Sequence, residues 1–248
     1  MRLSVIIPAY NEESRLPKTL EEVDKYLKRQ PYEYEIIVVN DGSKDGTAGM
    51  VKSAQKRIQN LILLDNKQNH GKGYVVRQGM LEAKGDLRLF MDADNATSVD
   101  QVERMWPELE QGYEVVIGSR DLKESVIAVR QPWIRQRLGD VFNIIVQAFS
   151  GLWGYWDTQC GFKGFTAKAA EDIFARTRID RWAFDVEALV LAKKLGYGIR
   201  EIPVTWINDP NSKVKLSGMV NMLGEVLKIR WNSILNVYGR IQRKSQVV

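Results

Sequence analysis

Cysteine and histidine are nearly absent from this chain of 248 residues, which contains one of each, Cys160 and His70. A single cysteine cannot form a disulfide within the chain, and a zinc site built from cysteine and histidine is almost excluded. Any metal bound here is therefore expected to be a hard cation held by oxygen ligands. We interpret His70 as a loop residue without a chemical role.

Long apolar runs are lacking as well. No stretch reaches the roughly 18 apolar residues expected of a membrane-spanning helix, and the short run in MRLSVIIPAYNEE does not fit a secretory signal peptide. We therefore expect a cytoplasmic protein without a spanning helix. The net charge of +5 is modest, so nucleic acid is not expected as a partner. Neither a P-loop nor a Gly-x-Gly-x-x-Gly motif is present.

The first half of the chain alternates short apolar runs with helical patterns. This alternation predicts an α/β fold, with a mostly parallel sheet covered by helices on both faces. In the second half, Pro203 favours an edge or irregular position for its strand. Strands are expected at 3–10, 34–43, 61–66, 87–94, 113–120 and 199–207. Helices are expected at 16–29, 47–59, 71–85, 100–111, 181–196 and 216–239, with a helix-like segment at 131–156.

Charged and polar side chains follow the predicted strands at their carboxyl ends, where ligands bind in sheets of this kind. Three of these ends carry carboxylates and one carries an arginine. Because these charged side chains gather on one edge of the sheet, they predict a site for a charged ligand and a cation. The four ends are Tyr10-Asn11-Glu12, Asn40-Asp41-Gly42, Asp92-Ala93-Asp94 and Ser119-Arg120.

Asp92 and Asp94 stand one residue apart, which places both carboxylates on the same side of an extended strand. Two such carboxylates repel each other unless a cation lies near them. The alternative is a helix cap formed by Asp94 or Ser98. Asp41 could likewise be a turn residue or an acceptor for a base or ribose. Lys72 could be a solvated lysine or a basic group beside a diphosphate at a helix start.

Several motifs together resemble the inverting family 2 glycosyltransferases with the GT-A fold. They occur in order as VIIPAYNEE, VVNDGSKDGT, GKGYVVRQGM, MDADNAT and IGSR. In the second half, DTQCGFKGFT, RWAFDVEAL and PVTW are similar to motifs of the dolichyl-phosphate β-glucosyltransferases and, more loosely, of the dolichyl-phosphate mannose synthases. The resemblance covers nearly the whole chain.

The resemblance implies a role for each matching position. Asp94 would ligate Mg²⁺ or Mn²⁺ at the diphosphate, with Asp92 near the ribose or donor sugar. Asn95 departs from the family, which usually has glycine or another small or polar residue there, but asparagine tolerates unusual backbone angles. The positions expected to bind the donor nucleotide are Pro8, Tyr10, Glu12, Asp41, Lys72, Asp92 and Ala93. Those expected to line the sugar and acceptor side are Arg120, Arg135, Gln159, Arg181, Trp182 and Lys213.

The nature of the acceptor decides whether a general base is needed. A phosphate monoester has a second pKa of about 6, so it is largely dianionic at neutral pH and can attack without a base. It needs positive charge, for which Arg120 and Arg135 are the favoured candidates. A hydroxyl acceptor would instead need Asp157 or Asp185 as the base. The alternative for these two aspartates is a helix cap or an orienting hydrogen bond.

Two segments predict contact with a membrane surface. Residues 141–156 are uncharged and rich in aromatic side chains, which suits the interface, although a core helix is the alternative. The chain from 211 has seven basic residues against one acid, Glu225. This pattern is typical of a basic amphipathic helix on a membrane, or of a helix packed on the domain. We divide the chain into a glycosyltransferase domain, 1–210, and a basic amphipathic tail, 211–248.

Within the domain we expect a nucleotide-binding half, 1–120, and an acceptor half, 121–210. The predicted function is metal-dependent, inverting transfer of a hexose, glucose from UDP-glucose, onto a polyprenyl phosphate. GDP-mannose as donor, a sugar hydroxyl as acceptor, and a non-catalytic nucleotide-sugar binder stay open as alternatives. A nucleotidyltransferase would need a glycine-rich loop and an arginine after the first strand, which PAYNEES does not offer.

Overall fold

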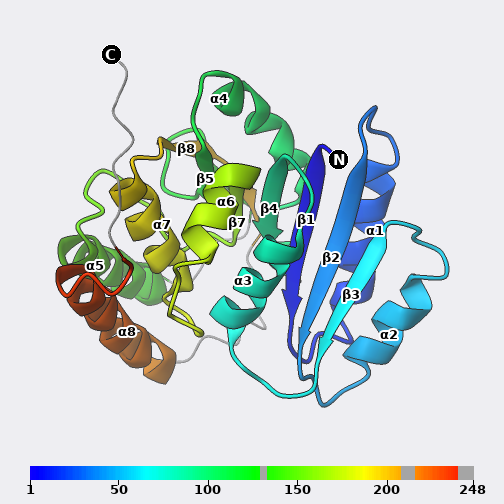
Figure 1. The fold of residues 1–248 in the computed structure, drawn as a ribbon, viewed down its shortest axis with the longest axis horizontal. Helices are drawn as coiled ribbons and strands as arrows, with labels where there is room; N and C mark the ends of the chain where they lie inside the picture. Colours follow the sequence, from blue (N-terminus) through cyan, green and yellow to red (C-terminus); the bar gives the residue numbers. More distant parts are fainter. Residues whose placement is uncertain (129–132, 208–215, 240–248) are drawn as a thin grey trace.

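The computed structural model describes residues 1–128, 133–207 and 216–239. A seven-stranded sheet forms its centre, in the order β3-β2-β1-β4-β7-β5-β8 (Figure 1). All neighbouring pairs are parallel except those that β7 makes with β4 and β5. The strands are β1 (Leu3–Ala9), β2 (Tyr34–Asp41), β3 (Leu61–Asn66), β4 (Leu87–Met91), β5 (Val115–Ser119), β7 (Phe162–Thr166) and β8 (Ile199–Pro203). The predicted, mostly parallel α/β sheet is confirmed.

Helices cover both faces of this sheet because its central strands are apolar on both sides. Val5 and Ile7 of β1 pack on one face, while Ile6 between them packs on the other. The first face is covered by α1 (Leu16–Leu27), α2 (Thr47–Ala54) and α4 (Trp106–Glu110). The second is covered by α3 (Lys72–Glu82), α5 (Trp133–Ser150), α6 (Ala167–Phe174), α7 (Phe184–Leu195) and α8 (Leu216–Ile234). Each β1 side chain is buried.

Strand β7 and helix α6 were not predicted from the sequence. The strand is five residues long and contains a lysine and a glycine, which weaken both its apolar pattern and its strand propensity. It runs antiparallel between β4 and β5, with Phe162 opposite Met91. The turn that precedes β7 therefore lies directly beside Asp92, whose N–H donates to Gly161 O at 3.1 Å.

Several element boundaries differ from the predicted ones. The predicted strand at 199–207 is two strands, β8 and the short β9 (Thr205–Trp206), which pairs with β6 (Val126–Ile127). Pro203 ends β8 at the edge of the sheet, as expected from its missing N–H. Helix α5 stops before Gly151, whose φ of 73° is left-handed. The predicted helix at 100–111 is a 3-10 turn, Val99–Arg104, followed by α4.

Candidate active site

The turn after β4 holds the two aspartates close together. Asn95 adopts a left-handed φ of 55°, which asparagine tolerates better than most residues. This bend lets Ala96 N–H donate to Asp94 Oδ1 at 3.1 Å, and Thr19 Oγ donates to Ala93 O at 2.7 Å. The 3-10 turn that follows has no side-chain cap bond from Ser98. The carboxylate of Asp94 thus stabilises the bend itself rather than capping the next helix.

Asp94 lies in an electrostatically unfavourable place for a carboxylate. Burial raises its pKa above the usual range, and the neighbouring Asp92 raises it further. The Ala96 N–H, Arg15 and Lys72 act in the opposite direction, but they do not restore the ordinary pKa. An added cation would favour the ionised form of this carboxylate.

Lys72 begins α3 and reaches Asp92, with 2.6 Å between Nζ and Oδ1. Burial alone would lower the pKa of this lysine, but Asp92 and Asp185 outweigh burial and raise it. Its ammonium lies 5.9 Å from the ring centroids of Trp182 and Phe184. Lys72 is therefore a charged group fixed beside the aspartate pair. Its expected position beside a diphosphate stays a prediction.

Glycines allow the close approach that builds this arrangement. A Cβ at Gly161 would overlap the carboxylate of Asp92, lying 2.9 Å from Oδ1 and closer still to Oδ2 and Cγ. A Cβ at Gly73 would lie 2.7 Å from Phe184 Cβ and closer still to Ile179 O. Side chains at either position would push the aspartate pair and the start of α3 out of place.

The chain from 178 to 183, here called the 178–183 segment, lies against the amino end of α3. Gly73 N–H donates to Arg181 O and Tyr74 N–H donates to Asp180 O, each at 3.1 Å. Arg77 of α3 also forms an ion pair with Asp180 at 2.8 Å. The segment is thus held on α3, and its Trp182 lies near Lys72.

Asp41 at the end of β2 has a structural role that the sequence did not reveal. It is buried and accepts hydrogen bonds from His70 N–H at 2.7 Å, Gly71 N–H at 2.9 Å and Asn69 Nδ2 at 2.8 Å. These bonds shape the loop that leads to Lys72. The predicted contact of Asp41 with the nucleotide stays a prediction.

The end of β1 contributes further residues that were predicted to contact the nucleotide. Pro8 lies within β1, opposite Val39, and Tyr10 just beyond it is exposed. Glu12 is buried and forms an ion pair with Arg15 at 2.7 Å. The carboxylate of Glu12 therefore already has a positively charged partner, and its predicted nucleotide contact stays a prediction.

The buried Asp157 forms an ion pair with the partly exposed Arg120, which follows β5. Arg120 donates from Nε and Nη2 to the two carboxylate oxygens at 2.7 and 2.8 Å, and from its backbone N–H at 3.0 Å. Although burial would raise the pKa of Asp157, Arg120 outweighs it and lowers that pKa. A carboxylate held in this way is a poor proton acceptor. The structure therefore favours an orienting hydrogen bond over a general base.

Asp185 has a partner that the sequence analysis missed. Lys163 of β7 is 1% exposed, and its Nζ lies 2.8 Å from Asp185 Oδ1. The same ammonium donates to Cys160 O. Burial raises the pKa of Asp185, while Lys163 and Lys72 oppose the shift. The signal for this pair was the lysine within the apolar stretch CGFKGF, since a charge in a buried strand needs a partner.

The remaining predicted positions are less defined. Gln159 is half-buried and its N–H bonds Asp157 at 3.3 Å, and Arg181 is exposed. The side chain of Arg135 and the whole of Lys213 lie outside the described residues.

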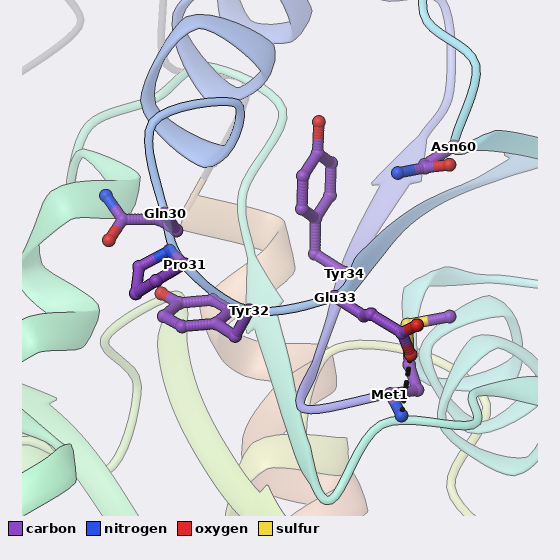
Figure 2. A pocket seen from close by; sticks show the side chains of 7 residues that line it. All are labelled: Met1, Gln30, Pro31, Tyr32, Glu33, Tyr34 and Asn60. Atoms are coloured by element: carbon purple, nitrogen blue, oxygen red, sulfur yellow. Dashed lines mark ion pairs between the residues drawn. The ribbon is translucent and has the colours of Figure 1, made fainter.

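Figure 2 shows a pocket at the opposite edge of the sheet, around Tyr32 and Tyr34. That pocket lies at the amino end of β2, away from the aspartate pair, and we assign it no role in the site.

Known proteins share the sequence family and the fold of this chain. Residues 4–174 match the family model described as glycosyl transferase family 2. Among solved structures, the fold is similar to glucosyl-3-phosphoglycerate synthase from Mycobacterium tuberculosis in complex with Mn²⁺, UDP and phosphoglyceric acid. That likeness has a TM-score of 0.67 at 16% identity and covers 100% of this chain and 81% of the other. The GT-A fold expected from the sequence motifs is confirmed.

Curated relatives narrow the family further. A dolichyl-phosphate beta-glucosyltransferase of Trichomonas vaginalis is 40% identical over 98% of this chain and 77% of its own length. The one from Dictyostelium discoideum is 40% identical over 95% and 76%, and the human one is 38% identical over 86% and 69%. This chain belongs to glycosyl transferase family 2 and, within it, to the family of the dolichyl-phosphate beta-glucosyltransferases.

Proposed function

We propose that this protein transfers glucose from UDP-glucose to a polyprenyl phosphate, dolichyl phosphate in particular, with inversion at the anomeric carbon. The observation that carries the proposal is the cluster of Lys72, Asp92 and Asp94 at the carboxyl edge of the sheet, in a chain of this family. The cluster has the charges needed to bind a nucleoside diphosphate through a cation.

A divalent cation, Mg²⁺ or Mn²⁺, is part of the proposal. The described residues contain no group of three or more His, Cys, Asp or Glu side chains that could enclose a metal. Asp94, with Asp92 beside it, instead offers hard oxygen ligands and leaves positions for phosphate oxygens, which suits Mg²⁺. The raised pKa of Asp94 fits this assignment, because a cation would favour its ionised form. The metal would stabilise the charge that develops on the leaving diphosphate.

The residues around the site suit an acceptor that needs no general base. Asp157 and Asp185 are both buried in ion pairs, with Arg120 and Lys163. A phosphate monoester is mostly dianionic above its second pKa of about 6 and can attack the anomeric carbon directly. Arg120, 31% exposed, would contribute positive charge toward such an acceptor.

A membrane surface is the proposed location of the acceptor. Helices α5 and α8 lie side by side (Figure 1). Val146 of α5 and Val226 of α8 are buried, while other apolar residues of these helices and of the chain just after each of them are exposed. We call this exposed set the apolar face. It consists of Ile144, Phe149, Trp153, Trp156, Val220, Leu227, Trp231, Ile234, Leu235 and Val237.

The apolar face is rich in tryptophan, which favours the interface between lipid and water. Among the described residues, none of the helices has the length and apolar character needed to cross a membrane. Binding to the cytoplasmic surface of a membrane through the apolar face is therefore the arrangement that we propose.

The test is a transfer assay with vesicles that contain a polyprenyl phosphate, in Mg²⁺ or Mn²⁺, with UDP-glucose and GDP-mannose as parallel donors. A glucosyl lipid formed from UDP-glucose, and lost on chelation of the metal, is the expected result. Product formed only from GDP-mannose would show that the donor is GDP-mannose and not UDP-glucose. If the protein binds UDP in the presence of the metal but forms no lipid product from UDP-glucose or from GDP-mannose, the transferase proposal is refuted.

A further inference from the structure

Two carboxylates, the buried Glu187 and the partly buried Glu225, accept hydrogen bonds from the ends of the 178–183 segment. Glu187 of α7 accepts hydrogen bonds from the N–H groups of Arg178 and Ile179, each at 2.9 Å. Glu225 of α8 accepts from Ala183 N–H at 2.9 Å, at the amino end of α7. A carboxylate is favoured at that end of a helix by the helix dipole. The segment beside Lys72 is therefore fixed between α3 on one side and α7 and α8 on the other.

Helix α8 supports both of these carboxylates. It carries Glu225 itself, and Tyr238, four residues past its end, donates from its hydroxyl to Glu187 Oε1 at 2.8 Å. Tyr238 is 3% exposed and Glu187 is fully buried, so this bond is shielded from water. The same helix presents Leu227 and Trp231 on the apolar face.

We propose that Glu225 is a positioning residue that links the membrane-facing helix α8 to the donor side of the active site. It holds the 178–183 segment against α3, and that segment keeps the amino end of α3, with Lys72, beside Asp92. This inference rests on the proposed function and adds one point to it. The helix that contacts the lipid surface also sets the geometry with which the nucleotide sugar is bound.

The effect of Glu225 is expected in the KM for the nucleotide sugar. Glu225→Ala removes a hydrogen bond to a charged acceptor, so this KM should rise about tenfold. The value of kcat should change by less than about twofold, because the lost contact stabilises the ground state and the transition state equally. Glu225→Gln keeps an oxygen that can accept from Ala183 N–H and should restore most of the affinity. Asn221→Ala, on the exposed side of α8, is the matched control and should behave as wild type.

Vesicle flotation separates positioning from membrane binding. Because Glu225 is not part of the apolar face, all three variants should float with vesicles to the same extent as wild type. Reduced flotation of Glu225→Ala together with the raised KM would overturn the proposal, since the defect would then lie in membrane binding. A wild-type KM in Glu225→Ala would overturn it as well, and so would an equal loss in Glu225→Gln.

A second variant covers the case in which Glu225→Ala does not fold. Tyr238→Phe removes only the hydroxyl that bonds Glu187 and should raise the same KM about threefold, as expected for a modest hydrogen bond. An unchanged KM in folded Tyr238→Phe would refute the link through α8. Failure of the proposed function is distinguishable, because the wild type itself would then form no lipid product.

Discussion

Gly161 lies in the second half of the chain, yet Gly161→Ala should displace Asp92 and so impair the active site. The added Cβ would lie 2.9 Å from Asp92 Oδ1, where ordinary contact begins at 3.4 Å, so Oδ1 would have to move about 0.5 Å and Oδ2 further. Asp92 cannot retreat freely, because its N–H bonds Gly161 O and its carboxylate bonds Lys72. Such overpacking typically costs about 1–3 kcal/mol of stability.

The same displacement should affect catalysis more than stability. A misplacement of about 1 Å in an active site can reduce the rate by roughly 10²-fold, so glucosyl transfer by Gly161→Ala should fall by about this factor. In a chain of this size, about 1 kcal/mol corresponds to a Tm change of roughly 2–4 °C, which differential scanning calorimetry resolves.

Gly49→Ala is the matched control for this substitution. Gly49 lies within α2, and a Cβ there would meet nothing within 4 Å. This variant should keep wild-type activity and gain about 0.5–1 kcal/mol from the better helix propensity of alanine. Wild-type activity in Gly161→Ala would refute the assigned contact between the turn before β7 and Asp92.

Three further outcomes are expected. Asp94→Asn should lose most metal-dependent transfer while keeping the wild-type Tm within a few degrees, and titration with Mn²⁺ should show weaker metal binding. Arg120→Ala should cost about 3–5 kcal/mol because it leaves the Asp157 carboxylate buried without its partner. Arg120 lowers the pKa of Asp157. The difference in free energy of unfolding between wild type and Arg120→Ala should therefore be present at neutral pH and disappear as the pH falls through that lowered pKa. Urea unfolding at several pH values measures this difference. Trp231→Glu should reduce vesicle flotation, whereas Leu81→Glu, an exposed position on α3, should not.

The sequence predicted the first half of the fold well because its signals there are local. Apolar residues dominate each of the first five strands, and α1, α2 and α3 begin within one residue of the expected position. A 3-10 turn stands where the fourth helix was expected to begin. The same argument placed charged residues at the carboxyl ends of the strands, but it did not predict that Lys72 pairs with Asp92. Such predictions need only the rule that parallel strands end on one edge.

The contacts between distant parts of the chain could not be predicted in this way. Lys163 and Asp185 are far apart in sequence, and their ion pair depends on β7 lying between β4 and β5. The pairing of Arg120 with Asp157 likewise joins two separate segments, so the sequence left open whether Asp157 was a base. A strand of five residues with an internal lysine carries too little periodicity to reveal its place in a sheet.

The position of β7 limits how enzymes of this kind can be recombined. This strand follows residue 120 in the chain, yet it is inserted between β4 and β5, which both precede that residue. A chimaera joined at residue 120 would therefore replace a central strand of the sheet, along with the Lys163 ammonium and the glycine turn beside Asp92. The segments before and after residue 120 therefore cannot be exchanged between proteins as independent modules. Acceptor choice would have to be altered through loops and helix surfaces while β7 is retained.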